Sequence, residues 1–524
     1  MNTILESYLC DTWQAGRGPG TPLVDPVHGN ELARATSDGL DLDAALAHAR
    51  EVGGRALREL GYAERAALLK AVAGVLGEHR DRYRQIALEN SGNTAVDAAL
   101  DIDGGIGTLR YYAGLGKSLG DARCLVEPGR ERLARDEAFQ ALHLLTPVTG
   151  VALHVNAFNF PSWGLWEKAA VALLSGVPVV AKPATATAWL AQAMVRDVVE
   201  AGVLPPGALS LVCGGGHELP GRLGGDDVVA FTGSAGTAAR LRETFAARTA
   251  PPRLTVEADS LNVGLLGPDA GPDSEEFALF VAEAVREMTV KAGQKCTAMR
   301  RLLVPADSLE AVADALSGRL DDVVVGDPRD PAVTMGPLIN RDQQRAAWDG
   351  IDRLRSEAEV VHGGTQAFEL RGADPEKGCF VPPTLLRCAE PDSARAVHEV
   401  EVFGPVATLM PYRDADEAFA LAARGGGSLV ASVFSADPSF AADAAVALGP
   451  AHGRVLLVDA AVGASQTGHG VVMPQCVHGG PGRAGGGEEL GGLRGLGFYH
   501  QRTAVQGDVA QLEAIEARAA TLPG

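Results

Sequence analysis

Several features that define large classes of proteins are missing from this sequence. Its 524 residues carry a net charge of −20, and no segment resembles a basic stripe, which argues against a nucleic-acid partner. No run of about 18 apolar residues occurs, so we predict no membrane-spanning segment. The N-terminus has no basic region before an apolar run, and we therefore expect no signal peptide.

Cysteine is sparse and unpatterned. The seven cysteines are scattered, and no two of them form a CxxC pair. This pattern favours neither a disulfide framework nor a zinc site, and the histidines show no ligand spacing. We therefore predict no metal ion and a reducing compartment, the cytoplasm.

Common nucleotide and catalytic motifs are also absent. The sequence contains no GxGxxG, no HExxH and no GxSxG. Gly116-Lys117-Ser118 resembles the end of a P-loop, but Tyr111 stands where that motif requires glycine. Aromatic residues make up only 5% of the chain, so we expect a core of Ala, Val and Leu. The length suggests two to four domains.

From residue 149 onward, short apolar strands alternate with helical patterns. The predicted strands cover 177–183, 208–213, 228–233 and 253–258, and the predicted helices cover 162–175, 187–201 and 235–248. This alternation predicts βαβ units and a parallel sheet, whose ligands bind at the carboxyl ends of the strands. The segments NAFNFP, KPATAT, FTGSAG and VEADS all stand at such ends. A second α/β region is predicted from residue 275.

Three other segments have their own patterns. Residues 42–58 and 63–89 are each predicted to form a helix. Residues 125–148 show no helical stripe, and we predict strands that leave the main body as an oligomerisation flap. The glycine-dense segment 478–492 is as compatible with a flexible linker as with an ordered structure.

Three residues that are distant in the chain could act on one carbonyl group. Cys296 follows a helix, and Lys291 and Lys295 beside it could lower the pKa of its thiol. Glu257 ends a strand, where a carboxylate can activate water. Asn159 follows another strand, where its amide can donate a hydrogen bond to an oxyanion. Each residue alone is more typical of a structural role, and only the set indicates chemistry.

A second group of residues could bind a phosphate-containing cofactor. Lys182 ends the strand VVAKP and can reach a ribose hydroxyl or a phosphate, and Thr185 could add a hydroxyl. Gly233 and Ser234 begin a predicted helix, where free backbone N–H groups bind phosphate.

The ordered series FNFP, KPAT, FTGS, a strand-end glutamate, GQKC and EVFGP resembles the aldehyde dehydrogenase family over nearly the full length. The resemblance implies an α/β fold with a Rossmann-like parallel-sheet cofactor domain, an α/β catalytic domain and a small β flap used in dimerisation. The implied boundaries are 1–124 with 149–265 for the NAD(P)-binding domain, 266–475 for the catalytic domain, 125–148 with 493–510 for the bridging segment, and 476–492 for a glycine-rich segment near the active site.

The resemblance also implies roles for the candidate residues. Cys296 is the expected nucleophile and Glu257 the general base, while Asn159 and the backbone N–H of Cys296 form the oxyanion hole. Phe160 and Glu489 are expected beside the substrate.

On the cofactor side, Lys182 and Ser234 are expected to bind the dinucleotide. Glu401 in EVFGP is expected to hold the nicotinamide ribose, with Phe403 beside the ring. NAD-preferring members often carry Glu where this chain has Thr185. Because a carboxylate there would repel a 2′-phosphate, we predict NADP as the preferred cofactor, with NAD possible but weaker.

Other departures from the family pattern point to one branch. The segments SWGLWEKAA, VEADSLN and HGGPGRAGGGEELGG resemble semialdehyde dehydrogenases that act on coenzyme A (CoA)-linked intermediates of aromatic degradation. VEADSLN replaces the usual ELGGK, which leaves the packing of that segment open. Because the chain stops at 524, without room for a hydratase, we expect a free-standing homodimeric enzyme of benzoate degradation.

The expected reaction is the NADP-dependent oxidation of 3,4-dehydroadipyl-CoA semialdehyde through a thiohemiacetal and a thioester on Cys296. The alternative substrates are 3-oxo-5,6-dehydrosuberyl-CoA semialdehyde of phenylacetate degradation and general aliphatic aldehydes. A CoA-acylating dehydrogenase, an acyl-phosphate reductase and a non-catalytic protein on this fold are the alternative functions.

Overall fold

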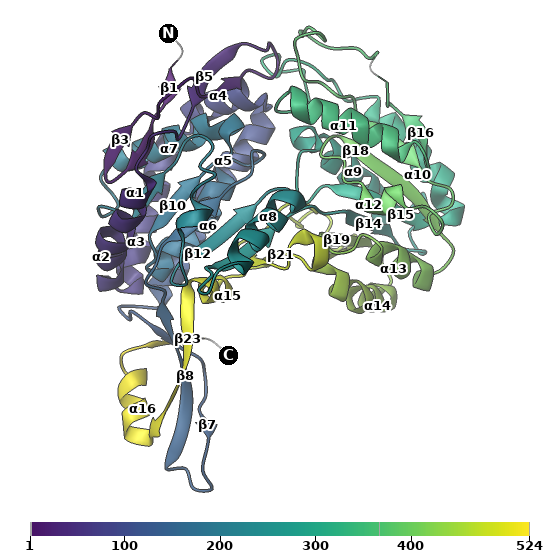
Figure 1. Cartoon of the computed structure of the whole chain (residues 1–524). Coiled ribbons are helices and arrows are strands. Elements are labelled where there is room, and N and C mark those ends of the chain that lie inside the picture. The colour runs from purple at the N-terminus through teal and green to yellow at the C-terminus, as the bar shows by residue number, and fades with distance from the viewer. Residues whose placement is uncertain (1–2, 366, 523–524) are drawn as a thin grey trace.

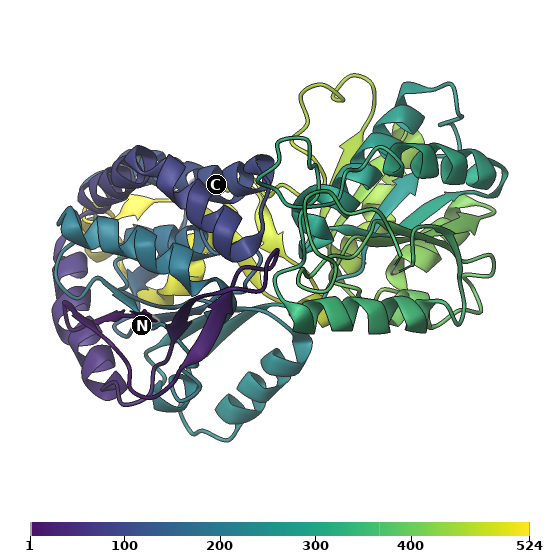
Figure 2. The ribbon, with the colours of Figure 1, turned by 90° about the horizontal axis from the view of Figure 1, so that it is seen from above.

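The computed structural model describes residues 3–365 and 367–522. Two lobes, each built on a seven-stranded sheet, lie side by side, and a narrow β extension projects from the first lobe (Figures 1 and 2). In the described part of the chain, no helix is long and apolar enough to cross a membrane.

The first sheet is parallel except at one edge. In spatial order, its strands are β13 (Arg253–Glu257), β12 (Val228–Thr232), β9 (Ala152–Val155), β10 (Val179–Lys182), β11 (Leu209–Leu211), β2 (Ser7–Leu9) and β3 (Thr12–Gln14). β2 pairs with β11 in antiparallel fashion, whereas β13 to β11 are parallel to one another. A small sheet of β1 (Ile4–Leu5), β5 (Glu31–Ala35) and β4 (Thr21–Val24) lies beside it.

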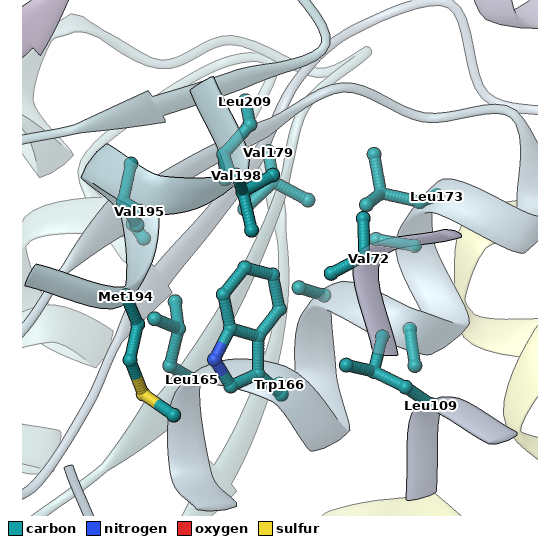
Figure 3. Packing of buried hydrophobic residues seen from close by; sticks show 14 of the residues in the cluster. Val72, Leu109, Leu165, Trp166, Leu173, Val179, Met194, Val195, Val198 and Leu209 are labelled. Atoms are coloured by element: carbon teal, nitrogen blue, oxygen red, sulfur yellow. The ribbon is translucent and has the colours of Figure 1, made fainter. Parts of the chain in front are cut away.

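Helices cover both faces of this sheet. They are α1 (Leu42–His48), α2 (Gly54–Glu59), α3 (Tyr62–Glu78), α4 (Arg80–Ser91), α5 (Ala95–Ser118), α6 (Trp163–Ser175), α7 (Ala188–Glu200) and α8 (Ala235–Ala246). The fully buried Trp166 of α6 lies at the centre of the core on one face, with Val72 of α3, Leu109 of α5 and Leu209 of β11 around it (Figure 3).

Two helices differ from the prediction. The single helix expected over 63–89 is wrong, because the chain breaks between α3 and α4 at His79, where φ is −108° and ψ is 14°. Helix α5 was not predicted at all, since its many glycines are poor helix formers. The structure shows why they are there: a Cβ at Gly104 would overlap the Trp163 ring, and a Cβ at Gly116 would overlap Leu174. Close packing therefore outweighs helix propensity in α5.

The second sheet organises the other lobe. In spatial order, its strands are β16 (Glu359–His362), β17 (Thr384–Arg387), β18 (Val406–Tyr412), β15 (Met299–Pro305), β14 (Asn262–Leu266), β19 (Ser428–Phe434) and β20 (His452–Val458). Its helices are α9 (Glu275–Thr289), α10 (Leu309–Leu320), α11 (Arg341–Leu354), α12 (Ala396–Glu399), α13 (Ala415–Ala423) and α14 (Pro438–Leu448). Because β14 pairs with β15 and β19, the expected domain boundary after residue 265 lies inside a strand of this second sheet.

The extension, which we call the flap, is built on two long strands that pair although they are far apart in the chain. β8 (Phe139–Pro147) pairs in antiparallel fashion with β23 (His500–Asp508), and β6 (Leu125–Val126), β7 (Glu131–Arg132), β24 (Ala520–Thr521) and α16 (Val509–Glu516) complete it. Residues 493–499, which we had assigned to this segment, instead form α15 (Leu493–Leu496) and a helical turn that lead up to β23.

The glycine-dense segment is an ordered part of the main body. β21 (Val477–Gly479) pairs with β22 (Glu488–Leu490) in a short antiparallel hairpin. Gly479 has a φ of +143° and lies so close to Gly487 that a Cβ would overlap its carbonyl oxygen. The glycines thus allow close backbone contact, and the flexible-linker interpretation is wrong.

Candidate active site

Two cavities meet at Cys296, between the two lobes. We call the first the tunnel; its wall includes Phe160, Trp163, Glu167, Lys168, Val472 and His478. We call the second the cleft; its wall includes the predicted cofactor residues Lys182, Thr185, Gly233, Ser234, Glu401 and Phe403. Asn159, Glu257 and Cys296 line both cavities. The structure therefore brings the three candidate catalytic residues together where the cavities join.

The loop that carries Cys296 is bent by three consecutive left-handed residues. After α9 the chain passes through Lys291, Ala292 and Gly293, with φ values of 53°, 51° and 67°. Left-handed backbone is unfavourable for residues other than glycine, so the loop needs external support. Asp97 of α5 accepts a hydrogen bond from the backbone N–H of Lys291 at 2.8 Å. Arg300 donates to the carbonyl of Gly293 at 2.7 Å.

Asn262, in the unusual segment VEADSLN, holds the other side of the same loop. Its Nδ2 donates to the carbonyl oxygens of Cys296 at 2.8 Å and Ala298 at 3.0 Å. Its Oδ1 accepts from the Ser260 hydroxyl at 2.6 Å. Asn262 thus helps to position the nucleophile. The sequence analysis missed this role, although a polar residue at the start of an apolar strand was a signal.

The lysines beside Cys296 do not assist its ionisation as expected. Lys295 forms a buried ion pair with Glu287 at 2.6 Å, and the Lys291 ammonium lies 4.7 Å from the centre of the Phe160 ring. Burial raises the pKa of the Cys296 thiol well above its ordinary value, and the neighbouring Glu257 raises it further. The expectation of a lysine-activated thiol is therefore wrong, and deprotonation requires a nearby base.

Glu257 is placed to act as this base, and His478 is its partner. Its Oε2 lies 3.0 Å from Nε2 of His478, and one carboxylate oxygen of Glu257, one ring nitrogen of His478 and the Cys296 Sγ all lie within 4.8 Å of one another. Burial alone would raise the pKa of Glu257, but His478 and Lys168 reverse this effect and lower the pKa to about 2. Conversely, Glu257 raises the pKa of His478 in spite of burial. The sequence analysis did not single out His478, because nothing local marks it as a partner of Glu257.

A buried lysine links this pair to two further carboxylates. Lys168 Nζ lies 3.1 Å from both Glu167 and Glu489. Burial raises the pKa of Glu489 to about 7, with Lys168 opposing the shift and Glu167 adding to it. Glu489 is not part of the tunnel wall, but one of its carboxylate oxygens lies within 4.8 Å of carboxylate oxygens of Glu167 and Glu257, which are.

The cleft, by contrast, contains groups that are free to bind a ligand. Burial lowers the pKa of Lys182, and its ammonium has no hydrogen-bond or ion-pair partner among the described residues. The Thr185 hydroxyl donates to the Gly214 carbonyl at 3.2 Å. Ser234 caps α8, and a Cβ at Gly236 in the first turn would meet nothing within 4 Å. One N–H group of this turn, that of Ala235, is already bonded to Asp259 at 2.9 Å.

Glu401 and Phe403 close the inner end of the cleft. Glu401 accepts a hydrogen bond from the backbone N–H of Ser260 at 3.2 Å. Burial raises the pKa of Glu401 to about 7, although Arg300 opposes the shift. Phe403 packs edge-on against Phe158, with 5.7 Å between ring centres.

The site and the fold agree with what comparison with known proteins finds. A model described as the aldehyde dehydrogenase family matches residues 13–505. The chain belongs to the aldehyde dehydrogenase family. It is 55% identical over 477 residues to a 3,4-dehydroadipyl-CoA semialdehyde dehydrogenase of Aromatoleum evansii, which covers 91% of this chain and 93% of that protein. The predicted fold and the predicted class, an NAD(P)-dependent aldehyde dehydrogenase, are confirmed.

Two further similarities are informative. Protein MaoC of Klebsiella aerogenes is 48% identical over 182 residues, which cover 34% of this chain and 52% of that protein. The solved NAD+ complex of an aldehyde dehydrogenase from Bacillus cereus superposes with a TM-score of 0.83 at 25% identity and covers 96% of both chains.

Proposed function

We propose that this enzyme oxidises 3,4-dehydroadipyl-CoA semialdehyde to the corresponding acid, with NADP as the preferred electron acceptor. The observation that carries the reaction type is the convergence of Cys296, Glu257 and Asn159 at the junction of two cavities, one for an aldehyde and one for a dinucleotide. The choice of aldehyde is supported by 55% identity to an enzyme named for that substrate.

In the proposed first step, the Cys296 sulfur attacks the aldehyde carbon. Because burial holds the thiol protonated, the proton passes to a base, and the Glu257 carboxylate is within 4.8 Å. The carbonyl oxygen becomes an oxyanion, to which the Asn159 amide can donate from the shared cavity wall. The product of this step is a thiohemiacetal on Cys296. A nicotinamide cofactor, when bound, accepts the hydride that leaves the thiohemiacetal carbon.

In the proposed second step, Glu257 activates water against the resulting thioester. Because its pKa is low, Glu257 first releases the proton taken from Cys296 to bulk water, and in its ionised form it can then accept a proton as water adds to the thioester carbon. The C–S bond then breaks and releases the acid and the Cys296 thiolate.

The residues of the cleft fit a dinucleotide. The open first turn of α8 can accept phosphate, and Lys182 is a cation without a counter-ion. Solved relatives of the same fold are NAD+ complexes. We propose NADP rather than NAD because Thr185 leaves the neighbourhood of Lys182 without a carboxylate that would repel a 2′-phosphate. Glu401 is proposed to hold the nicotinamide ribose, with Phe403 beside the ring.

We further propose that the first lobe is the cofactor domain, the second lobe the catalytic domain and the flap a homodimerisation element. The flap projects from the main body and exposes 43% of Phe139 and 45% of Leu133 (Figure 1). All seven cysteines are free, which supports a reducing compartment such as the cytoplasm. Analytical ultracentrifugation of the intact enzyme tests the dimer, and a monomer at micromolar concentration would contradict it.

Steady-state kinetics test the proposed reaction. We expect a higher kcat/KM with a CoA-linked six-carbon semialdehyde than with hexanal, and a lower KM for NADP than for NAD. The free acid should form without added CoA, because Glu257 directs water to the thioester. Strict dependence on added CoA would instead identify an acylating dehydrogenase, and equal activity with hexanal would identify a general aliphatic aldehyde dehydrogenase.

A further inference from the structure

The structure also contains a cationic groove outside the catalytic centre. Helices α3 and α5 pack against each other, and the groove between them has a floor of small residues and a rim of three cations, Lys70, Arg110 and Lys117. The floor consists of Ala63, Ala66, Ala67, Gly74, Ala113 and Gly114. Among the residues that the structure describes, none that lines the groove is acidic.

The three cations are available for a ligand. Lys70, Arg110 and Lys117 are exposed, and in the described ranges 3–365 and 367–522 none of their side chains forms an ion pair or a hydrogen bond. The chain as a whole has a net charge of −20, so a groove with three unpaired cations in its wall is locally positive on an acidic protein. Such a rim favours phosphate groups, and a floor of small apolar residues leaves room for a ring such as adenine.

The groove is connected to the tunnel by α5. Trp163 and Gly164 line the tunnel and are partly exposed, so the tunnel opens beside them. Trp163 packs directly on Gly104 of α5. From that point an exposed strip of α5 leads towards Lys117, over a rise of about 20 Å at about 1.5 Å per residue.

The strip offers an unobstructed path. Gly107, Arg110, Gly114 and Lys117 recur at helical spacing and are all exposed. A Cβ at Gly107 or Gly114 would meet nothing within 4 Å. A flexible arm that leaves the tunnel at Trp163 can therefore lie along α5 and bring a phosphorylated end group to the groove.

We propose that this groove binds the 3′-phosphoadenosine diphosphate end of the substrate's CoA, while the pantetheine arm lies along α5 and the aldehyde end reaches Cys296. This inference rests on the proposed function, since it needs a CoA-linked substrate. Arg483, the other candidate phosphate partner, is already engaged, because it donates to the Glu399 carbonyl at 3.0 Å and lies 3.8 Å from Asp259.

The test uses the intact enzyme and the triple variant Lys70→Glu/Arg110→Glu/Lys117→Glu. We expect KM for the CoA-linked semialdehyde to rise about tenfold or more, because three phosphate contacts become repulsive, while the kinetics with hexanal stay unchanged. The matched control, Arg55→Glu/Arg319→Glu/Arg353→Glu, changes the net charge equally at exposed positions away from the groove. An equal rise of KM in this control would overturn the inference.

A truncated substrate separates the inference from the proposed function. With a pantetheine-linked semialdehyde, which lacks the adenosine and its phosphates, the wild type and the groove variant should have equal KM values. If the wild type oxidises the CoA-linked substrate no better than hexanal, the proposed function itself fails. If the wild type prefers it and the groove variant keeps that preference, only the groove assignment fails.

Salt dependence provides a second measurement that does not rely on any variant. In the wild type, KM for the CoA-linked semialdehyde should rise as ionic strength increases, and KM for hexanal should not. A KM for the CoA-linked substrate that is independent of salt would overturn the groove assignment, even if the triple variant failed to fold.

Discussion

The tunnel and the cleft share Cys296, Glu257 and Asn159 but differ in how their charged groups are satisfied. In the tunnel, Lys168 contacts two carboxylates, and His478 contacts Glu257. In the cleft, Lys182 has no partner among the residues that the structure describes. The cations of the tunnel are thus paired with carboxylates, whereas the lysine of the cleft has no counter-ion.

This difference matches the chemistry proposed for each cavity. Buried ion pairs cost desolvation free energy, so a paired cluster is retained where a fixed protonation state is useful, as for Glu257. A lysine whose pKa is lowered by burial gains most when a phosphate restores its counter-charge. Substitutions on the two sides should therefore have separable effects on chemistry and on cofactor affinity.

The largest effect is expected at Glu257. Glu257→Gln should lower kcat by about 10²- to 10⁴-fold, because water loses its general base. Acylation of Cys296 should slow as well, because its thiol loses its proton acceptor, but the thioester should then persist. The burst of reduced cofactor, close to one equivalent, should therefore rise more slowly than in the wild type and still precede an even slower steady phase in stopped-flow absorbance. Glu243→Gln, at an exposed position of α8, is the control. Normal steady-state turnover by Glu257→Gln would contradict the assigned role.

Asn159→Ala should affect mainly the first step of the reaction, the acylation of Cys296. Loss of an oxyanion donor should slow acylation by about 10²- to 10³-fold, and the burst should disappear together with turnover. Stopped-flow comparison with Glu257→Gln distinguishes the two steps. A preserved burst in Asn159→Ala would show that its amide does not stabilise the oxyanion.

Thr185→Glu should affect only the cleft. A carboxylate near Lys182 should weaken NADPH binding about tenfold or more through repulsion of the 2′-phosphate, and should leave NADH binding nearly unchanged. Cofactor fluorescence titration measures both affinities without turnover. Thr185→Val, which removes the hydroxyl without adding charge, is the control, and equal losses for both cofactors would count against an NADP site here.

The smallest effect is expected from His478→Gln, as a change in pH dependence. Glu257 has a lowered pKa, so in the wild type its ionised form persists well into acid solution. Removing the His478 charge raises this pKa, and the acid limb of the kcat profile should move to higher pH. His143→Gln, on the flap, is the control. An unchanged acid limb would mean that His478 does not influence the base.

Much of the fold could be predicted because it depends on local patterns. The alternation of apolar strands and amphipathic helices located β10, β12, β13 and α6 within a few residues. Helix α5 escaped this reasoning, because two of its glycines, Gly104 and Gly116, are explained only by Trp163 and Leu174 on a neighbouring helix. The break at His79 likewise has no strong marker in the sequence.

The site shows the same division. The types and order of Cys296, Glu257 and Asn159 could be recognised from motifs, since each ends or follows a strand or a helix that the pattern locates. The wrong expectation for Lys291 and Lys295 arose because sequence proximity was taken as electrostatic proximity. In the structure, Lys295 is paired with Glu287, and Lys291 lies over the Phe160 ring.

The amino-acid sequence by itself determined the alternating α/β architecture, the family and the identity of the residues that surround Cys296, because these depend on local periodicity and short motifs. Only the tertiary structure decided which charged groups lie beside those residues. Three features join segments that are far apart in the chain: His478 pairs with Glu257, Asn262 hydrogen-bonds the Cys296 loop, and the cationic groove forms between α3 and α5. Electrostatic interactions depend on distance and burial in space, and neither can be read from spacing along the sequence.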